Sequence, residues 1–209
     1  MFKRIGSAVY LSLILAIAGG LVGCYPDETV TNPQYHLDSS RSYLPDLEGF
    51  TRYYIAKGYH ECNPRYLQYL SLSELRFQVC FDSSAIYTTV DPENQADINK
   101  LYGFGDNKAA HNSYSARFGW RWEGNALALF AYVYNQGSFE FKKIGNVAIA
   151  QIHKCRIQVQ GASYVFTLND SIQVTMPRKA KTINGEGYRL YPYFGGNEKA
   201  PHDVKIWIK

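Results

Sequence analysis

Short segments in which apolar and polar residues alternate make up most of the chain after residue 50. The segment LRFQVCFD shows the pattern, because Leu75, Phe77 and Val79 fall on one face and polar residues fall between them. Successive side chains of a strand point to opposite faces of a sheet, so a period of two predicts β-strands. About nine such segments, separated by glycine, asparagine and proline, predict an antiparallel β-sandwich or barrel.

The segment HNSYSARFGWRW, residues 111–122, has the same period with bulkier side chains. Its aromatic face carries Phe118, Trp120 and Trp122. The opposite face carries Arg117 and Arg121, with a glycine between them that leaves room. The aromatic face is expected to pack in the core. The arginine face is either an ordinary solvated surface or the floor of a site for a polar or anionic ligand.

Only one helix is expected, in the segment PENQADINKLYG. Asp91 can cap it, Pro92 suits the first helical position and Gly103 can end it. Two hairpin turns are expected, one at Asn135-Gln136-Gly137 and one at Asn169-Asp170.

The first residues predict a secreted protein that is attached to a membrane. Residues 1–23 contain two basic residues, a short apolar run and then small residues, as signal peptides do. The tetrapeptide LVGC at its end resembles the lipobox of bacterial lipoproteins, which implies acylation of Cys24 and a membrane contact through this lipid. Residues 24–48 are rich in proline and small polar residues and predict a tether, so the folded domain is expected over 49–209.

The residues after the cysteine bear on the destination. The residue after Cys24 is Tyr25 rather than an aspartate. In this respect the sequence resembles lipoproteins that are sent on to the outer membrane of Gram-negative bacteria. The pair Asp27-Glu28 resembles the export signal of cell-surface lipoproteins in Bacteroidetes-type bacteria. The formal net charge of the whole chain is only +4, and loss of the signal peptide brings it closer to neutral. Nucleic acid is therefore not an expected partner, because phosphate binding needs a concentrated basic excess.

Cysteine usage leaves the disulfide question open. With Cys24 acylated, Cys62, Cys80 and Cys155 remain, which allows one bond. Cys80 and Cys155 are expected to point to opposite sides of their strands, so a bond between Cys62 and Cys80, or no bond, is favoured. No zinc-type or calcium-loop spacing is present, and neither a metal nor a cofactor is expected.

The order of segments from about residue 50 resembles the concanavalin A-like jelly roll of lectins, glucanases and some polysaccharide lyases. Four sequence segments resemble an uncharacterised family of Bacteroidetes-type lipoproteins, namely FDSSAIY, INKLYGFGD, SARFGWRW and LYPYFGGNEKAPHDV. The resemblance implies an all-β sandwich with at most one short helix, whose concave sheet binds glycan or polysaccharide. Arg117 and Arg121 would then bind the glycan, joined by Arg76, Gln78 and Asp82 if their strands share the concave sheet.

Catalysis is uncertain from the sequence, and binding without catalysis is favoured. Residues 151–153 (QIH) and 133–136 (VYNQ) are similar to motifs of alginate lyases, but they occur in the reverse order, so His153 is expected to be structural. The carboxylate motif of jelly-roll glucanases is absent. If the protein is an enzyme, it is expected to be a lyase acting on uronate-containing glycans, with His111, Tyr132 and Tyr134 as weak catalytic candidates. A third hypothesis is an adhesin-like surface protein without a small ligand.

Overall fold

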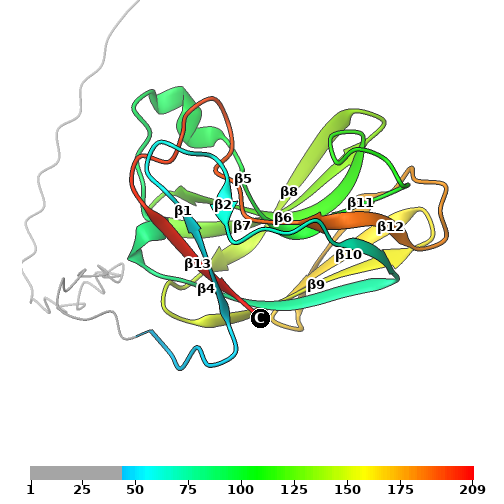
Figure 1. Cartoon of the computed structure of the whole chain (residues 1–209), viewed down its shortest axis with the longest axis horizontal. Coiled ribbons are helices and arrows are strands. Elements are labelled where there is room, and N and C mark those ends of the chain that lie inside the picture. Colours follow the sequence, from blue (N-terminus) through cyan, green and yellow to red (C-terminus); the bar gives the residue numbers. More distant parts are fainter. Residues whose placement is uncertain (1–43) are drawn as a thin grey trace, which may run out of the picture. The chain divides into compact units, whose positions relative to one another are not determined.

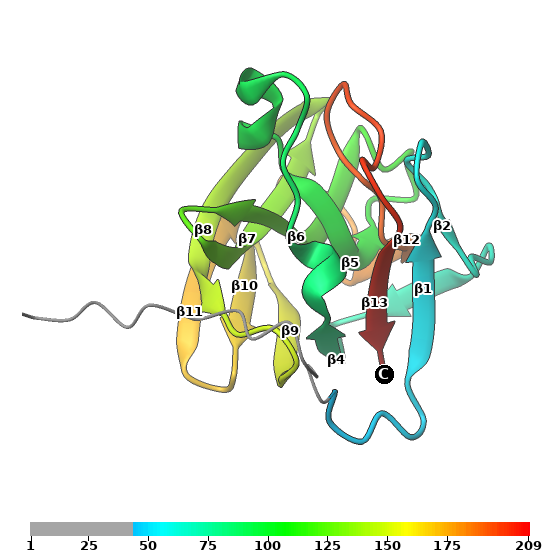
Figure 2. The same cartoon turned by 90° about the vertical axis from the view of Figure 1, so that its left-hand side faces the viewer.

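The computed structural model describes residues 44–209. The predicted signal peptide, the predicted acylation site at Cys24 and most of the predicted tether lie outside the described residues. In the described part, two antiparallel sheets pack face to face as a β-sandwich (Figures 1 and 2). The prediction of an all-β sandwich is confirmed. Among residues 44–209, no helix has the length and apolar character that crossing a membrane requires.

One sheet has seven strands, in the order β11-β10-β9-β4-β13-β1-β2. Their bounds are β1 Thr51–Ile55, β2 Cys62–Asn63, β4 Glu74–Phe81, β9 Ile152–Gln160, β10 Ser163–Leu168, β11 Ile172–Pro177 and β13 Val204–Ile208. The other sheet has six strands, in the order β3-β12-β5-β6-β7-β8. Their bounds are β3 Tyr69–Leu72, β5 Asn99–Gly105, β6 Tyr114–Glu123, β7 Ala126–Asn135, β8 Ser138–Val147 and β12 Gly185–Leu190.

The core lies between the sheets and contains the aromatic face of residues 111–122. Phe118 and Trp120 are both completely buried. The Phe118 ring meets Phe77 of the opposite sheet edge-on, with ring centroids 5.5 Å apart, and meets Phe166 at 5.3 Å. Such edge-to-face pairs add to the free energy gained by burying the rings. The prediction for the aromatic face is therefore confirmed.

The predicted helix is mostly wrong. Asp91 does cap a short 3-10 helix, η2 (Pro92–Ala96), and a second one, η1, spans Ser83–Ala85. After η2 the chain enters β5 and not a longer helix, because Leu101 and Phe104 are buried between the sheets from an extended backbone paired with β6. Here strand pairing and burial outweigh the local capping signal. Both predicted hairpin turns are confirmed, with positive φ at Gln136-Gly137 and at Asn169-Asp170.

All three cysteines of the described part are buried and unpaired. Cys155 pairs across the strands with Phe77 and faces the core, whereas Cys80 pairs with Ile152 on the other side of the same sheet. The opposed directions predicted for these two cysteines are confirmed. Of the two predicted alternatives, a Cys62–Cys80 disulfide or no bond, the structure has no bond.

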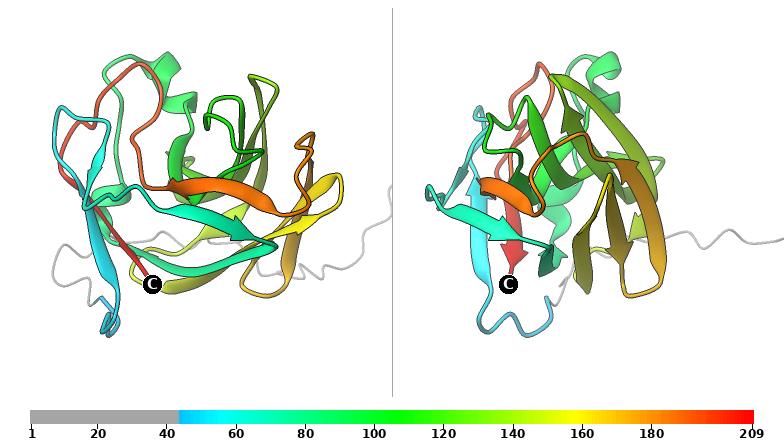
Figure 3. Two further views of the ribbon diagram at one scale, coloured as in Figure 1. Left: turned by 45° about the vertical axis from the view of Figure 1, so that its right-hand side comes forward. Right: turned by 90° about the vertical axis from the view of Figure 1, so that its right-hand side faces the viewer.

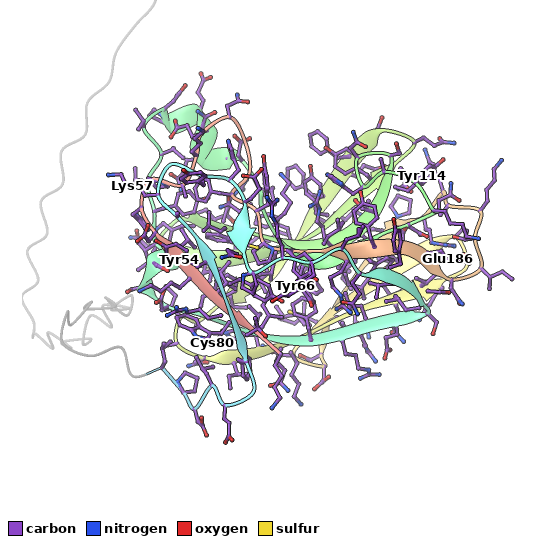
Figure 4. The ribbon with its side chains drawn as sticks, viewed as in Figure 1. Tyr54, Lys57, Tyr66, Cys80, Tyr114 and Glu186 are labelled. Atoms are coloured by element: carbon purple, nitrogen blue, oxygen red, sulfur yellow. The ribbon has the colours of Figure 1, made fainter. Side chains whose placement is uncertain are left out.

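The two ends of the domain carry different loops. Tyr114, at the start of β6, and Glu186, on β12, lie at one end, and Lys57, in the loop after β1, lies at the other (Figure 4). Figure 3 shows that the η2 loop, the loop before β13 and the β7–β8 hairpin all rise on the same side of the six-stranded sheet. These loops frame the outer face of that sheet.

Candidate functional site

The residues predicted to bind a ligand do not share one sheet. Arg76 and Gln78 lie on β4 of the seven-stranded sheet, and Asp82 follows directly after it, whereas Arg117 and Arg121 lie on β6 of the six-stranded sheet. The expectation of a single surface is therefore wrong. The chain changes sheets between β4 and β5, and a period of two cannot show which sheet a strand joins.

The residues on the seven-stranded sheet have local partners. Arg76 is paired with Glu74. Asp82 accepts a 2.8 Å hydrogen bond from the backbone N–H of Ser84 and so caps η1. A depression of about 340 Å³ lies beside Arg76 and Gln78. A charged residue at its edge, Lys154, is already paired with Asp170 at 2.9 Å. These contacts explain the polar residues without a ligand.

On the arginine face of β6, both Arg121 and the room above Gly119 have structural explanations. Arg121 is paired with Glu123, and its guanidinium lies 4.9 Å over the ring of Phe130. The room expected above Gly119 is filled, because a Cβ there would lie 2.4 Å from Cγ2 of Ile98. Gly119 is therefore needed for the close approach of residue 98 and not for a ligand.

Arg117 differs from the other arginines on these surfaces. Its exposure is only 7 %. Its guanidinium lies 5.8 Å from the ring centroid of Tyr132, its neighbour on β7, and its Nε has no hydrogen-bond partner. Within residues 44–209 it forms no ion pair with a carboxylate. A desolvated charge without a partner is costly, so this position demands an explanation.

Tyrosines, and not carboxylates, surround this guanidinium. Burial lowers the pKa of Arg117, and four nearby phenol groups oppose that shift. These are Tyr132, Tyr134, Tyr188 and Tyr193. Phenol groups supply hydrogen-bonding oxygens and ring faces, but they carry no charge at neutral pH. The positive charge therefore remains uncompensated in the protein.

A second cation lies beside the same ring. Lys100, on β5, places Nζ 4.7 Å from the centroid of Tyr132 and donates to the carbonyl oxygen of Ile98 at 2.6 Å. Burial, with repulsion by Arg117 as a smaller cause in the same direction, lowers the pKa of Lys100 to about 8. Two cations on either side of one ring favour an anion at this place.

His111 lies at the rim of the same site. Its backbone N–H donates to the Tyr188 hydroxyl at 3.0 Å, and its ring Nδ1 lies 2.9 Å from that hydroxyl. Burial lowers the pKa of His111, and the charge of Arg117 lowers it as well. A neutral imidazole hydrogen-bonded to a phenol can accept or pass on a proton.

Arg117 and His111 open into a groove of about 520 Å³. Its wall also includes Tyr188 and Tyr193, together with the segments 61–62, 65–67 and 189–192, whereas Lys100 lies behind this wall, beside the Tyr132 ring. The weak catalytic candidates Tyr132 and Tyr134 contribute to the surroundings of Arg117. The structure thus brings His111 and both tyrosines together around one of the predicted ligand residues, and leaves Arg76, Gln78 and Asp82 elsewhere.

An aromatic shelf adjoins this groove, formed by the rings of Tyr132, Phe139 and Phe141. The rings are nearly parallel: Tyr132 lies at 6° to Phe139 and at 3° to Phe141, with centroids 5.6 and 6.3 Å apart. Phe139 and Phe141 lie on β8, the edge strand, and are 54 % and 42 % exposed. The shelf therefore exposes the aromatic surface of Phe139 and Phe141 to solvent, next to the buried Tyr132.

Sequence reasoning missed three residues of the site, namely Lys100, Tyr188 and Tyr193. Lys100 lay in the segment predicted to be helical. Tyr188 and Tyr193 belong to the segment GYRLYPYFGG, whose high tyrosine content was the only signal available. His153, predicted to be structural, is buried with Nε2 2.8 Å from the carbonyl oxygen of Ala148. Within residues 44–209, no cluster of three metal-ligating side chains is present.

No family model matches the chain, and no curated protein matches it in sequence. Solved structures do match its fold. An alginate lyase superposes with a TM-score of 0.54 at 9 % identity, over 80 % of this chain and 75 % of that one. The laminarinase catalytic domain of Thermotoga maritima gives 0.52 at 6 % identity, over 77 % and 75 %.

A family 16 glycoside hydrolase from Bacteroides ovatus, solved with a product of mixed-linkage glucan, gives 0.51 at 9 % identity, over 77 % of this chain and 80 % of that one. At these identities the likeness concerns the fold alone. The chain has the concanavalin A-like jelly-roll fold, as the order of segments predicted.

Proposed function

We propose that this protein is a lipid-anchored protein of the outer membrane, exposed on the cell surface, whose jelly-roll domain binds an acidic glycan in the groove around Arg117. One observation carries the binding proposal: Arg117, a residue only 7 % exposed, lines a groove and has no carboxylate partner in the described domain. A carboxylate of the ligand would supply the missing partner in a two-pronged hydrogen bond. Solved structures of the same fold include an alginate lyase and glucanases, which supports a glycan ligand.

The surrounding groups suit a sugar acid better than a small inorganic anion. Lys100 adds a second positive charge, and the phenol groups around Arg117 can bind hydroxyl groups as donors or acceptors. Tyrosine rings also offer flat faces to the C–H side of a sugar ring. The groove volume, about 520 Å³, lies within the range typical of small-molecule sites. An adhesin-like protein without a ligand was the expectation for a shallow surface, and the groove argues against it.

Polysaccharide lyase activity is the second candidate, favoured by the hydrogen bond between His111 and Tyr188 beside Arg117. In such a reaction the arginine would neutralise the uronate carboxylate, and the imidazole or the phenol would take the proton next to it. The glycosidic C–O bond would then break as the double bond forms, and the departing oxygen would receive a proton. The products contain a new double bond that absorbs near ~235 nm. The activity is therefore testable in the same samples as binding.

The test is a glycan array followed by calorimetric titration of the wild-type protein, Arg117→Met and Arg76→Met. Arg76→Met is the matched control, because it removes an arginine from the other sheet. We expect Arg117→Met to weaken binding of acidic glycans by about 1.5 to 3 kcal/mol, the contribution of a charge-assisted hydrogen bond, with no change in the control. Equal affinities of the two variants would contradict the proposal. Absorbance measured in parallel separates binding from cleavage.

The anchor is tested separately. Mass spectrometry of the protein extracted from membranes is expected to show acyl groups on Cys24 and loss of residues 1–23. A chain that retains Met1, or a free thiol at residue 24, would contradict the anchor and leave the binding proposal intact.

A further inference from the structure

The aromatic shelf is not required by the core. Phe139 and Phe141 point away from the space between the sheets, on a strand that has a neighbour on one side only. In β8 the residues Ser138–Lys143 are all exposed. Large aromatic rings at exposed positions do not gain the free energy of burial in the core. Two of them side by side form an exposed apolar patch, which is typical of a binding surface.

The shelf is continuous with the proposed binding groove. Strand pairing places Arg117 beside Tyr132, and Tyr132 beside Phe141, in one row across β6, β7 and β8. The Tyr132 ring therefore contacts the cations on one side and stacks with the shelf on the other. Adjacent strands are about 4.8 Å apart, so this row spans about 10 Å, a distance that a single sugar ring does not cover.

The surroundings of the shelf favour a ligand that is apolar on one face and polar at its edges. Lys143 pairs across the strands with Phe130 and so lies on the same face of β8 as the two phenylalanines, where it forms an ion pair with Glu123. A large apolar partner covering the shelf would have to desolvate this ion pair. A pyranose ring would cover the phenyl faces with its C–H groups and leave its hydroxyl groups in water.

We propose that the aromatic shelf binds a second sugar ring, next to the acidic sugar held at Arg117, so that the site recognises an oligosaccharide and not a single sugar. This inference rests on the proposed function, because it places the second ring relative to the first. The second sugar would contact the exposed surface of these aligned rings. The ligand therefore crosses the strands, from the groove toward the edge of the six-stranded sheet.

The experiment is a length series. The probes are uronic acid monomers to hexamers made from alginate and from polygalacturonate, titrated calorimetrically against the full chain solubilised in detergent. The wild-type affinity is expected to rise about tenfold or more from the monomer to the longer oligomers. The double variant Phe139→Ala/Phe141→Ala should lose this rise and bind the monomer like the wild type. Glu140→Ala, on the opposite face of the same strand, is the matched control and should keep the rise.

A second variant separates stacking from general apolar contact. Phe139→Leu/Phe141→Leu keeps apolar side chains but removes the flat faces, so it should also lose the rise with length. Circular dichroism melting checks that both double variants are folded, and their unchanged monomer affinity gives a second check.

Several results would overturn the inference. If the alanine variant binds every length like the wild type, the shelf is not part of the site, although the proposed function stands. Full affinity in the leucine variant would exclude stacking on the rings. If light scattering shows a wild-type dimer that both double variants abolish, the shelf binds a second copy of the chain. If the wild-type protein binds no acidic glycan at all, the proposed function fails first.

Discussion

Two buried arginines, Arg178 and Arg117, are treated in opposite ways by this fold. Arg178 follows β11, and its Nε donates to the carboxylate of Asp106 at 2.8 Å. Nη2 donates to the carbonyl oxygen of Asn184 at 2.9 Å and to the hydroxyl of Thr182 at 3.0 Å, and Nη1 donates to the carbonyl oxygen of Gly161 at 3.3 Å. Arg117 is almost equally buried but has tyrosine rings around it and no carboxylate.

The difference shows which charge serves the fold and which is available to a ligand. Every donor group of Arg178 that is buried has an acceptor from the protein, and the pair joins the segment after β11 to the end of β5. Such a complete network fixes the structure. Arg117 lies at the wall of a groove and keeps a donor without a partner. A site that departs from the rule of paired buried charges is where function is expected.

The largest effect is expected from removing the carboxylate of the paired arginine. Asp106→Ala leaves Arg178 charged and buried, so the free energy of unfolding should fall by about 3 to 5 kcal/mol in a urea titration. The control is Asp82→Ala, which removes only a cap of the short helix η1 and should lose about 1 kcal/mol. A loss at Asp106 no larger than that of the control would mean that the two arginines do not differ.

Acid should act on the same pair. Burial alone raises the pKa of Asp106, but hydrogen bonds from Arg178 and Tyr164 outweigh it and hold the pKa below its usual value. A carboxyl group whose pKa is depressed by folding stabilises the folded state above its unfolded pKa, and this contribution is lost as the pH falls through its folded pKa. Urea titrations from pH 5 downward should show the wild-type protein losing stability toward that of Asp106→Ala.

A smaller effect is expected at Lys100, through pH. Because its pKa is about 8, it is mostly protonated at pH 7 and mostly neutral at pH 9. The affinity for an acidic glycan should fall over this range by up to about tenfold, the contribution of one charge-assisted hydrogen bond. Calorimetric titration of the wild type and Lys100→Met would show it, since the variant should bind weakly at both values. A wild-type affinity that does not change would remove Lys100 from the site.

The stability of the fold should respond to Lys100 in the opposite direction. The pKa of this lysine is lower in the folded than in the unfolded chain, so between about pH 8 and 10 the unfolded chain binds more protons. The contribution of this group to stability therefore rises with pH over that interval. Lys100→Met should flatten this part of the pH profile in thermal melts.

Next in size is the loss of one hydroxyl from the tyrosines near Arg117. Tyr188→Phe removes the hydrogen bonds to His111, so we expect a loss of about 1 kcal/mol in the free energy of unfolding. The pKa of His111, followed by NMR titration, should also change. An unchanged histidine pKa together with unchanged stability would show that this tyrosine does not organise the rim.

The smallest effect on stability is expected at the unpaired arginine itself. Arg117→Met replaces a desolvated charge by an apolar chain of similar length. The free energy of unfolding should therefore fall by no more than about 0.5 kcal/mol, or it should rise. Thermal melts of Arg117→Met and Arg178→Met, measured side by side, test the comparison directly, because only Arg178→Met should lower the melting temperature strongly. If both variants melt equally far below the wild type, Arg117 is a structural partner and not a ligand group.

The sequence predicted the sandwich because alternation determines which face of each strand is apolar. Phe118 and Trp120 were assigned to the core from this period alone, and both are buried. The period does not determine which sheet a strand joins, which is why Arg76 and Arg117 were grouped although they lie on different sheets. The pairing register of β6, β7 and β8 brings Arg117, Tyr132 and Phe141 together. No local sequence pattern predicts this register.

The site residues that were missed have a related cause. Lys100 is part of a segment with good helix-capping residues, and only the partner strand β6 makes it a strand. Tyr193 lies in no regular strand and reaches the site through backbone hydrogen bonds to Lys100 at 2.9 and 3.0 Å. Long-range pairing of this kind is tertiary information.

The three buried cysteines of the described domain are expected to be unreactive toward thiol reagents while the domain is folded. Burial raises the pKa of the Cys62 thiol to about 12 and that of Cys80 to about 11, and the fully buried Cys155 shifts in the same direction. Since the thiolate is the reactive form, alkylating reagents should label these residues only when the domain opens. Their labelling rate can therefore report the rate of unfolding. A Glu140→Cys substitution would give the folded domain one selective attachment point for a fluorescent dye, on the face of β8 opposite the shelf.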